Sequence, residues 1–202
     1  SSDAVHLDYK QGARSLGRLL GEQGIEVVYG GGRVGLMGAL ADGALEAGGR
    51  VIGVIPHKLM DLELGHTGCS ELITTHGMHP RKKIMAERAQ AFIAMPGGYG
   101  TMEELFEAVT WTQLNYHDKP VGLLDIRNYF EPLLAWLDLA VTEGFIGPLH
   151  RQLMVSHSNP STLLDAMAKV RYPSLSELLE SRDPTLAKEP SNSLPLKSTE
   201  EI

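Results

Sequence analysis

The 202-residue sequence predicts one α/β domain over residues 1–171, a Rossmann-like, doubly wound parallel sheet with helices on both faces. Short, continuously apolar runs alternate with longer segments in which apolar residues recur every three or four positions. Continuous apolar runs are typical of parallel strands that helices cover on both faces. Glycine clusters follow two of these runs directly, as they do where strands turn into helices in nucleotide-binding folds.

The first half of the chain is predicted to start with a helix over Tyr9–Gly24, whose apolar residues have helical spacing. The β-rich run Ile25–Tyr29 predicts a strand that stops at a glycine cluster. Next come a helix over Leu36–Ala47, a strand over Val51–Ile55 and a short strand over Leu72–Thr75. The polar segment His57–Gly68 lacks periodicity, so we expect a long loop of the kind that often carries function.

The second half of the chain continues the same alternation. The predicted helices cover Pro80–Gln90, Thr101–Asn115, Tyr129–Glu143 and Pro160–Val170, and the predicted strands cover Ala91–Met95, Val121–Leu124 and Leu153–Val155. From Tyr172 onward the sequence is rich in Ser, Pro, Glu and Lys without periodicity, which predicts a mobile tail over residues 172–202. Because the sequence begins at Ser1 without a methionine, we expect that a first strand of the sheet precedes Ser1.

Composition excludes several classes of function. The formal net charge of −7 argues against a surface that attracts nucleic acid or a membrane. No apolar stretch approaches the roughly 18 residues that span a bilayer, and the single cysteine, Cys69, fits a reducing compartment. The histidines lack the paired spacing of a zinc site. We therefore expect a cytoplasmic protein that acts on a small molecule without a metal or other cofactor.

A glycine-rich turn follows the strand Ala91–Met95. The run Pro96–Gly100 holds three glycines, and the helical pattern begins at Thr101. Backbone N–H groups and the positive end of a helix dipole converge on an anion in this arrangement. An ordinary strand-to-helix turn is the alternative interpretation.

Two carboxylates, Glu103 and Glu104, come directly inside this helix. Thr101-x-x-Glu104 has the pattern of a capping box, which would explain Glu104 as a structural cap. Carboxylates beside an anion site are also suited to face a ribosyl centre that becomes positive as it loses its base. The spacing leaves both roles open. Thr110 lies two turns further along the helix, where it could line the same pocket as Glu103.

A basic cluster opens the preceding helix. Arg81, Lys82 and Lys83 follow Pro80, in a first turn where the helix dipole disfavours positive charge. A local rule that is broken in this way often marks a functional site, and a solvated basic face is the alternative. Arg81 is the best candidate for a forked contact with phosphate or carboxylate, which a lysine could not reproduce.

A second glycine cluster contains the pattern G-x-G-x-x-G at Gly30, Gly32 and Gly35. A dinucleotide site also needs an acidic residue at the end of the next strand to bind the ribose hydroxyls. The segment Val51–Pro56 has no acidic residue, which disfavours an NAD-dependent oxidoreductase. A glycine-rich wall that faces a mononucleotide, or tight helix–strand packing, explains the cluster better.

Together these motifs resemble those of the Lonely-guy (LOG) family. The segment Pro96–Glu104 matches the family signature PGGxGTxxE, and Met78–Lys82 is similar to its MHxRK motif. Tyr29–Gly32, Gly35–Gly38 and Val51–Pro56 also match, so the resemblance runs in register from about Ser1 to Ile146. The family's first strand ends in Cys-Gly-Ser-Ser, of which only Ser1-Ser2 is present, and the tail beyond Tyr172 is longer than expected.

The resemblance implies a phosphoribohydrolase that converts cytokinin riboside 5′-monophosphates, and often AMP, into the free base and ribose 5-phosphate. By carry-over from the family motifs, Arg81 and Glu104 would be the catalytic pair. The substrate site would consist of Glu63, Arg81, Lys82, Gly97, Gly98, Tyr99, Gly100, Thr101, Met102, Glu103 and Thr110. The resemblance also implies a homodimer or larger homo-oligomer. The alternative function is a non-catalytic nucleotide or molybdenum-cofactor carrier of the same fold.

Overall fold

The computed structural model describes residues 4–60 and 65–182. Its strands are β1 (Val27–Tyr29), β2 (Val51–Pro56), β3 (Glu71–Thr75), β4 (Phe92–Ala94), β5 (Val121–Leu124) and β6 (Val155–His157). Its α-helices are α1 (Leu7–Glu22), α2 (Gly35–Glu46), α3 (His57–Met60), α4 (Met78–Arg88), α5 (Tyr99–Gln113), α6 (Glu131–Thr142), α7 (Pro160–Met167) and α8 (Leu175–Arg182). Two 3₁₀ turns, η1 (Ile126–Asn128) and η2 (His150–Gln152), complete the described elements.

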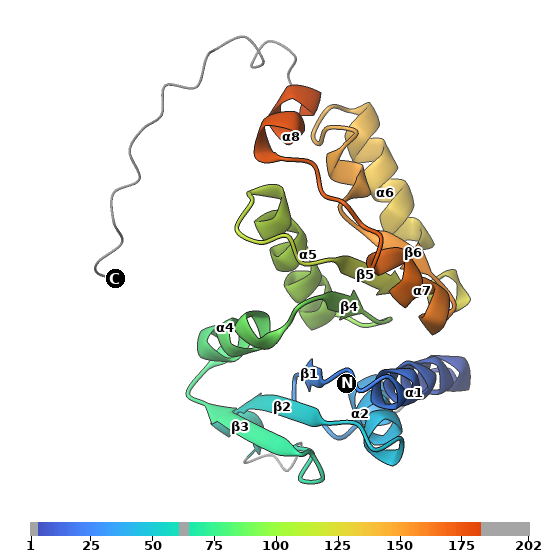
Figure 1. Ribbon diagram of the computed structural model, residues 1–202, viewed down its shortest axis with the longest axis vertical. Helices are drawn as coiled ribbons and strands as arrows, with labels where there is room; N and C mark the ends of the chain where they lie inside the picture. Colours follow the sequence, from blue (N-terminus) through green and yellow to red (C-terminus); the bar gives the residue numbers. More distant parts are fainter. Residues whose placement is uncertain (1–3, 61–64, 183–202) are drawn as a thin grey trace.

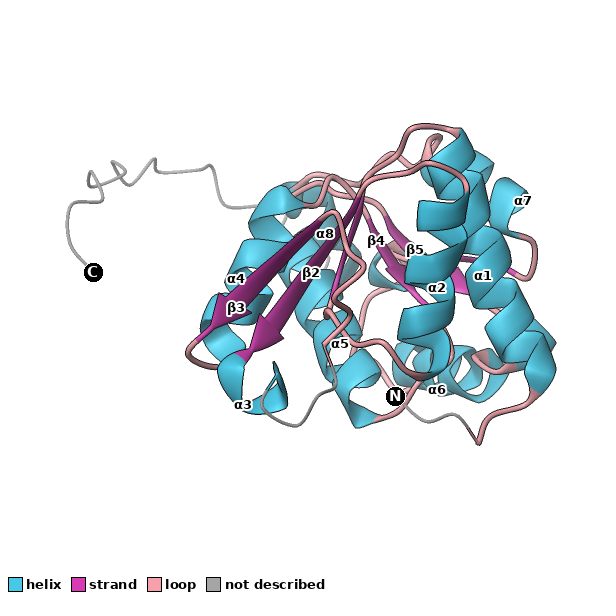
Figure 2. Ribbon diagram, turned by 90° about the horizontal axis from the view of Figure 1, so that it is seen from below, coloured by secondary structure: helices cyan, strands magenta, loops and turns pink. Residues whose placement is uncertain are grey.

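All described strand pairs are parallel. The strands hydrogen-bond in two sets of three, in the orders β1-β2-β3 and β4-β5-β6. In Figure 1 the first set lies below the second, and α4 leads from one to the other. Figure 2 shows helices on both sides of the strands. The predicted α/β class with a Rossmann-like parallel sheet is therefore confirmed.

Two apolar cores hold these layers together. One core packs α1 and α2 against β1 and β2, and the other packs α5 and α6 against β5. Helices α1 and α2 lie side by side in Figures 1 and 2. Gly17 permits this close contact, because a Cβ atom there would clash with the backbone of Leu40 on α2.

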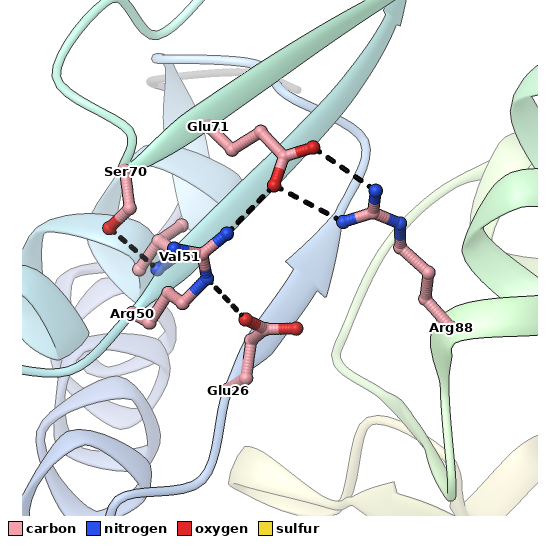
Figure 3. A network of polar contacts seen from close by, with 6 residues as sticks. All are labelled: Glu26, Arg50, Val51, Ser70, Glu71 and Arg88. Carbon is pink, nitrogen blue, oxygen red and sulfur yellow. Dashed lines mark hydrogen bonds and ion pairs between the residues drawn. The ribbon is translucent and has the colours of Figure 1, made fainter.

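An ion-pair network fixes the far end of α4 (Figure 3). Arg88, at the end of α4, donates hydrogen bonds from both terminal nitrogens to the Glu71 carboxylate on β3, at 3.2 and 3.1 Å. Arg50 donates to the same Glu71 carboxylate at 2.8 Å and to Glu26, just before β1, at 2.6 Å. Both arginines keep the pKa of Glu71 below its usual value, the contact with Arg88 being the larger cause. The network therefore attaches α4, which carries Arg81, to the first sheet.

The structure corrects the predicted tail and the predicted long loop. Residues 175–182 form helix α8, although no regular element was expected beyond Tyr172. Leu178 on α8 is 2% exposed, and the Tyr172 hydroxyl donates to the Leu153 carbonyl. Burial of this leucine gives the segment a reason to order that composition did not reveal. Within the predicted loop His57–Gly68, the short helix α3 forms directly after β2. The rest of the predicted tail, residues 183–202, lies outside the described residues.

Candidate active site

Two oppositely charged helix faces meet between α4 and α5. Arg81 donates from Nη1 to Glu104 Oε1 at 2.9 Å. The neighbouring Lys82 Nζ donates to Glu103 Oε1 at 2.5 Å and to Glu107 Oε2 at 2.7 Å. The carboxylates of α5 therefore offset the cationic first turn of α4, which the helix dipole alone would disfavour. This contact explains why the sequence places positive charge at the start of a helix.

Arg81 is the buried charge at the centre of this contact. The residue is only 8% exposed, and its Nε donates to the Val54 carbonyl on β2 at 3.0 Å. Its terminal nitrogens lie beside Gly30, where a Cβ atom would clash with the guanidinium. Gly30 therefore makes room for the arginine, so part of the glycine cluster after β1 serves the packing of a charged side chain rather than a dinucleotide.

The predicted capping box at Thr101 and Glu104 is wrong. Helix α5 begins at Tyr99 with Gly98 as its N-cap, and no side chain caps it. Thr101 is therefore the third residue of the helix, which leaves the Glu104 carboxylate to pair with Arg81. Burial raises the pKa of Glu104 above its ordinary value, while the Arg81 charge beside it acts in the opposite direction.

The exposed N-terminus of α5 is suited to bind an anion. The amide of Met102 makes the first intrahelical hydrogen bond, to the Gly98 carbonyl at 3.1 Å. The amides of the preceding residues, Tyr99 to Thr101, have no acceptor within the helix. Gly98, Tyr99 and Gly100 are exposed. Because α5 is 15 residues long, its dipole adds partial positive charge to these free donors.

A cavity of about 760 Å³ joins the ion pair to this helix N-terminus. Residues of β1 and β4 are among those that line it. Nine of the predicted site residues line it: Arg81, Lys82, Gly97, Gly98, Tyr99, Gly100, Thr101, Glu103 and Glu104. Glu63 lies outside the described residues. The exposed N-terminus of α5, an arginine and a carboxylate of raised pKa therefore share one cavity.

Two predicted substrate residues do not line this cavity. Met102 packs against the apolar core beneath α5, and Thr110 is exposed. The cavity is instead lined by Glu103, Glu107 and Trp111, which recur every fourth residue on α5. Thr110 shares the face of Glu103 through its seven-residue spacing, but it lies on the side of Glu103 away from Glu107 and Trp111.

Three further residues line the cavity that were not predicted from the sequence. The spacing of Glu107 and Trp111, four and eight residues after Glu103, could have identified both. Tyr129 lines the cavity from the chain just before α6, and its hydroxyl donates to the Gly97 carbonyl. No local sequence pattern predicts this hydrogen bond, because 32 residues separate Tyr129 from Gly97.

A metal-binding cluster and a membrane-spanning helix are both absent from the described residues. Within residues 4–60 and 65–182, no three or more His, Cys, Asp or Glu side chains gather as they would around a metal ion. In the same ranges no helix is both long and apolar enough to cross a membrane. Cys69 is a free thiol whose pKa is raised by burial.

Comparisons with known proteins agree with the motifs. The family model described as "Possible lysine decarboxylase" matches residues 37–167. "Probable cytokinin riboside 5'-monophosphate phosphoribohydrolase LOGL1" of Oryza sativa subsp. japonica is 51% identical over 155 residues, which are 77% of this chain and 70% of that protein. "Cytokinin riboside 5'-monophosphate phosphoribohydrolase LOG1" of Arabidopsis thaliana is 46% identical over 164 residues, 81% and 77% of the two chains.

Solved structures support the fold. The molybdenum cofactor binding protein from Rippkaea orientalis superposes with a TM-score of 0.64 at 24% identity, over 83% of this chain and 91% of that one. That identity is too low to transfer more than the fold. The family-model match and the extended identity with the plant proteins carry the assignment. The chain belongs to the LOG family.

Proposed function

We propose that this protein hydrolyses the N-glycosidic bond of N6-modified adenosine 5′-monophosphates and of AMP, releasing the free base and ribose 5-phosphate. The observation that carries the proposal is the Glu104 carboxylate, which a buried arginine holds in the same cavity as a free helix N-terminus. The two plant phosphoribohydrolases, which are 51% and 46% identical to this chain, support the same reaction.

The 5′-phosphate binds at the start of α5 in this proposal. The amides from Gly98 to Thr101 and the Thr101 hydroxyl supply donors, and the helix dipole supplies partial positive charge. With a net charge of −7, the protein as a whole repels an anionic ligand. A local site of this kind is therefore required for a nucleotide to bind.

Glu104 serves the sugar end of the substrate. As the bond between C1′ and the base nitrogen breaks, its electron pair leaves with the base and the ribose becomes oxocarbenium-like. The Glu104 carboxylate stabilises that positive charge. As water adds to C1′, one of its protons passes to Glu104, which later returns it to solvent, and the departing base takes up a proton from solvent. A carboxyl group of raised pKa is a better proton acceptor than an ordinary glutamate.

Arg81 positions Glu104 and the nucleotide. Its hydrogen bonds to the Val54 carbonyl and to Glu104 leave further guanidinium N–H groups beside Gly30, in the wall of the cavity. Because an arginine stays charged at all relevant pH values, it holds the carboxylate without competing for its proton.

Direct product analysis tests the proposal. The protein is incubated with AMP and with isopentenyladenosine monophosphate, and the mixture is separated by chromatography to detect free base. We expect base release from at least one of the two nucleotides. Nucleotide binding without release from either would overturn the hydrolase proposal and favour the non-catalytic carrier.

The proposal includes a cytoplasmic homodimer. The dimer follows from the family resemblance, and the single cysteine is consistent with a reducing compartment. Size-exclusion chromatography with light scattering should give twice the chain mass of 22.0 kDa, or a larger multiple for a higher homo-oligomer. A mass equal to that of one chain would refute the dimer. It would not bear on the proposed reaction, which product analysis tests.

A further inference from the structure

A tyrosine outside α5 holds the turn that starts this helix. The Tyr129 hydroxyl donates to the carbonyl of Gly97 at 2.6 Å. Gly97 immediately precedes the N-cap of α5, and Tyr129 immediately precedes the segment that leads into α6. Both residues line the cavity. The contact therefore joins a distant part of the chain to the proposed phosphate site.

The same contact fixes the direction of an amide. The Gly97 carbonyl and the Gly98 N–H belong to one peptide unit, which is planar and trans. In such a unit the C=O and N–H groups point in opposite directions. A hydroxyl that binds the carbonyl from one side therefore directs the Gly98 N–H toward the other side. Gly98 is the N-cap of α5, so this amide stands beside the free donors of the first helical turn.

The turn needs an external restraint because both of its residues are glycines. Without side chains, Gly97 and Gly98 have little steric preference for one orientation of the peptide between them. A flipped peptide would present the Gly97 carbonyl oxygen to the anion, and the oxygen's partial negative charge would repel it. Restraint of this peptide before the ligand arrives lowers the entropy that is lost on binding.

Tyr129 is itself held in place by its neighbours. The two residues before it, Arg127 and Asn128, have positive φ angles of 59° and 56°, which are uncommon for residues other than glycine. Arg127 donates to Asp8 on α1 at 2.8 Å. The Tyr9 ring packs edge-on against the Tyr129 ring, with 5.9 Å between the centroids. Strained backbone of this kind persists where the surroundings hold it, and it is concentrated at functional sites.

We propose that Tyr129 is a positioning residue for the phosphate of the substrate. Its hydroxyl holds the Gly97–Gly98 peptide so that the Gly98 amide joins the donors at the start of α5. This inference rests on the proposed function for the identity of the ligand, the ribose 5-phosphate part of a nucleotide. It assigns to Tyr129 no contact with the reacting atoms.

The test removes only the hydroxyl. In the full chain, Tyr129→Phe keeps the ring that packs against Tyr9 and loses the hydrogen bond to Gly97. We expect the dissociation constant for ribose 5-phosphate, measured by calorimetry, to rise about three- to tenfold, in line with the loss of one hydrogen bond. The affinity for adenosine, which lacks the phosphate, should not change. In amide NMR spectra, ribose 5-phosphate should shift the Gly98 signal less in the variant than in the wild type.

A matched control separates positioning from stability. Tyr172→Phe also removes a tyrosine hydroxyl, in this case a half-buried one that bonds the Leu153 carbonyl and the Val121 amide away from the cavity. It should lower the melting temperature and leave ribose 5-phosphate affinity unchanged. Three outcomes would overturn the inference: wild-type affinity in Tyr129→Phe, an equal loss of adenosine affinity, or the same loss in the control. Because binding is measured without turnover, ribose 5-phosphate binding by a protein that releases no base would refute only the proposed function.

Discussion

Arg81 and Glu104 form an ion pair of 2.9 Å that links α4 to α5 inside the cavity. The arginine side chain is 10% exposed and the glutamate side chain 35%. Removal of one partner of a largely buried pair leaves the other charge without compensation. The pair therefore couples the proposed chemistry of Glu104 to the packing of the two helices.

Glu104→Gln should abolish most of the turnover. The glutamine amide keeps the shape of the side chain. Because it carries no negative charge, it cannot stabilise a ribosyl cation or accept a proton as the carboxylate does. We expect kcat for base release to fall about 10²- to 10⁴-fold, with ribose 5-phosphate affinity within about threefold of the wild type. Glu87→Gln, on an exposed part of α4, is the control and should remain active. Undiminished turnover by Glu104→Gln would exclude the assigned role.

Gly30→Ala should displace Arg81. The added methyl group would occupy space that the guanidinium fills, so the arginine must shift relative to Glu104. A displacement of about 1 Å can lower kcat/KM about 10²-fold, and overpacking costs about 1–3 kcal/mol of stability. Gly77→Ala is the control, because a Cβ atom there meets open space. Kinetics and denaturant unfolding of both variants measure the two effects, and wild-type kinetics for Gly30→Ala would contradict this account.

The pH dependence of activity should report the ionisation of the Glu104 carboxyl group. Burial raises the pKa of its carboxyl above 4.5, and the ionised form is the active one in the proposed mechanism. Activity should therefore be lost as the pH falls through a value above 4.5. Because the Arg81 charge lowers the pKa of Glu104, Arg81→Gln should move this acidic limb to higher pH in the activity that remains. A limb that stays at the same pH in the variant would show that another group controls it.

Lys82→Met should destabilise the contact between α4 and α5. Lys82 bridges Glu103 and Glu107, and its side chain is 13% exposed. Without it, two carboxylates on one helix face lose their partner, at a cost of about 1–2 kcal/mol in the free energy of unfolding. Lys83→Met removes an exposed lysine from the next position and should change stability by less than about 0.5 kcal/mol. Equal effects of the two substitutions, in urea unfolding, would argue against a specific role for Lys82.

Leu178→Ala should release α8. Leu178 is 2% exposed, whereas Leu179 beside it is 45% exposed. Truncation of the buried leucine should remove about 2–5 kcal/mol of the packing free energy that holds the helix in place. Hydrogen exchange along residues 175–182 should accelerate in Leu178→Ala and change little in Leu179→Ala. Exchange that is already fast and equal in the wild type and both variants would restore the prediction of a mobile tail.

The same local pattern has different outcomes at two helix starts, because the position of a helix end depends on more than residue spacing. Thr101-x-x-Glu104 has the form of a capping box, yet the helix begins two residues earlier, at Tyr99. The same pattern at Ser174-x-x-Glu177 is a true box: the Glu177 amide donates to Ser174 Oγ and the Ser174 amide donates to Glu177 Oε2. The backbone conformation before a helix decides which residue becomes its N-cap. The glycines before Tyr99 allow α5 to begin earlier than Thr101.

Much of the architecture followed from apolar periodicity. The strand Val121–Leu124 was predicted with its observed bounds, and β2 with one residue fewer. Strands that are buried on both faces appear in the sequence as continuous apolar runs, because the side chains on each face pack against a helix. Helix α8 was missed because one buried leucine is not a periodic signal, and only its packing orders the segment.

The sequence by itself determined the α/β class, the two glycine-rich turns and the residues Arg81 and Glu104 as candidates. Each of these depends on neighbours in the chain or on a motif. The tertiary structure decided that the two side chains pair, that Gly30 makes room for the guanidinium, and that Tyr129 holds the turn before α5. The physical reason is distance along the chain. These contacts join residues 23 to 51 positions apart, and such pairings are selected by packing of the whole core.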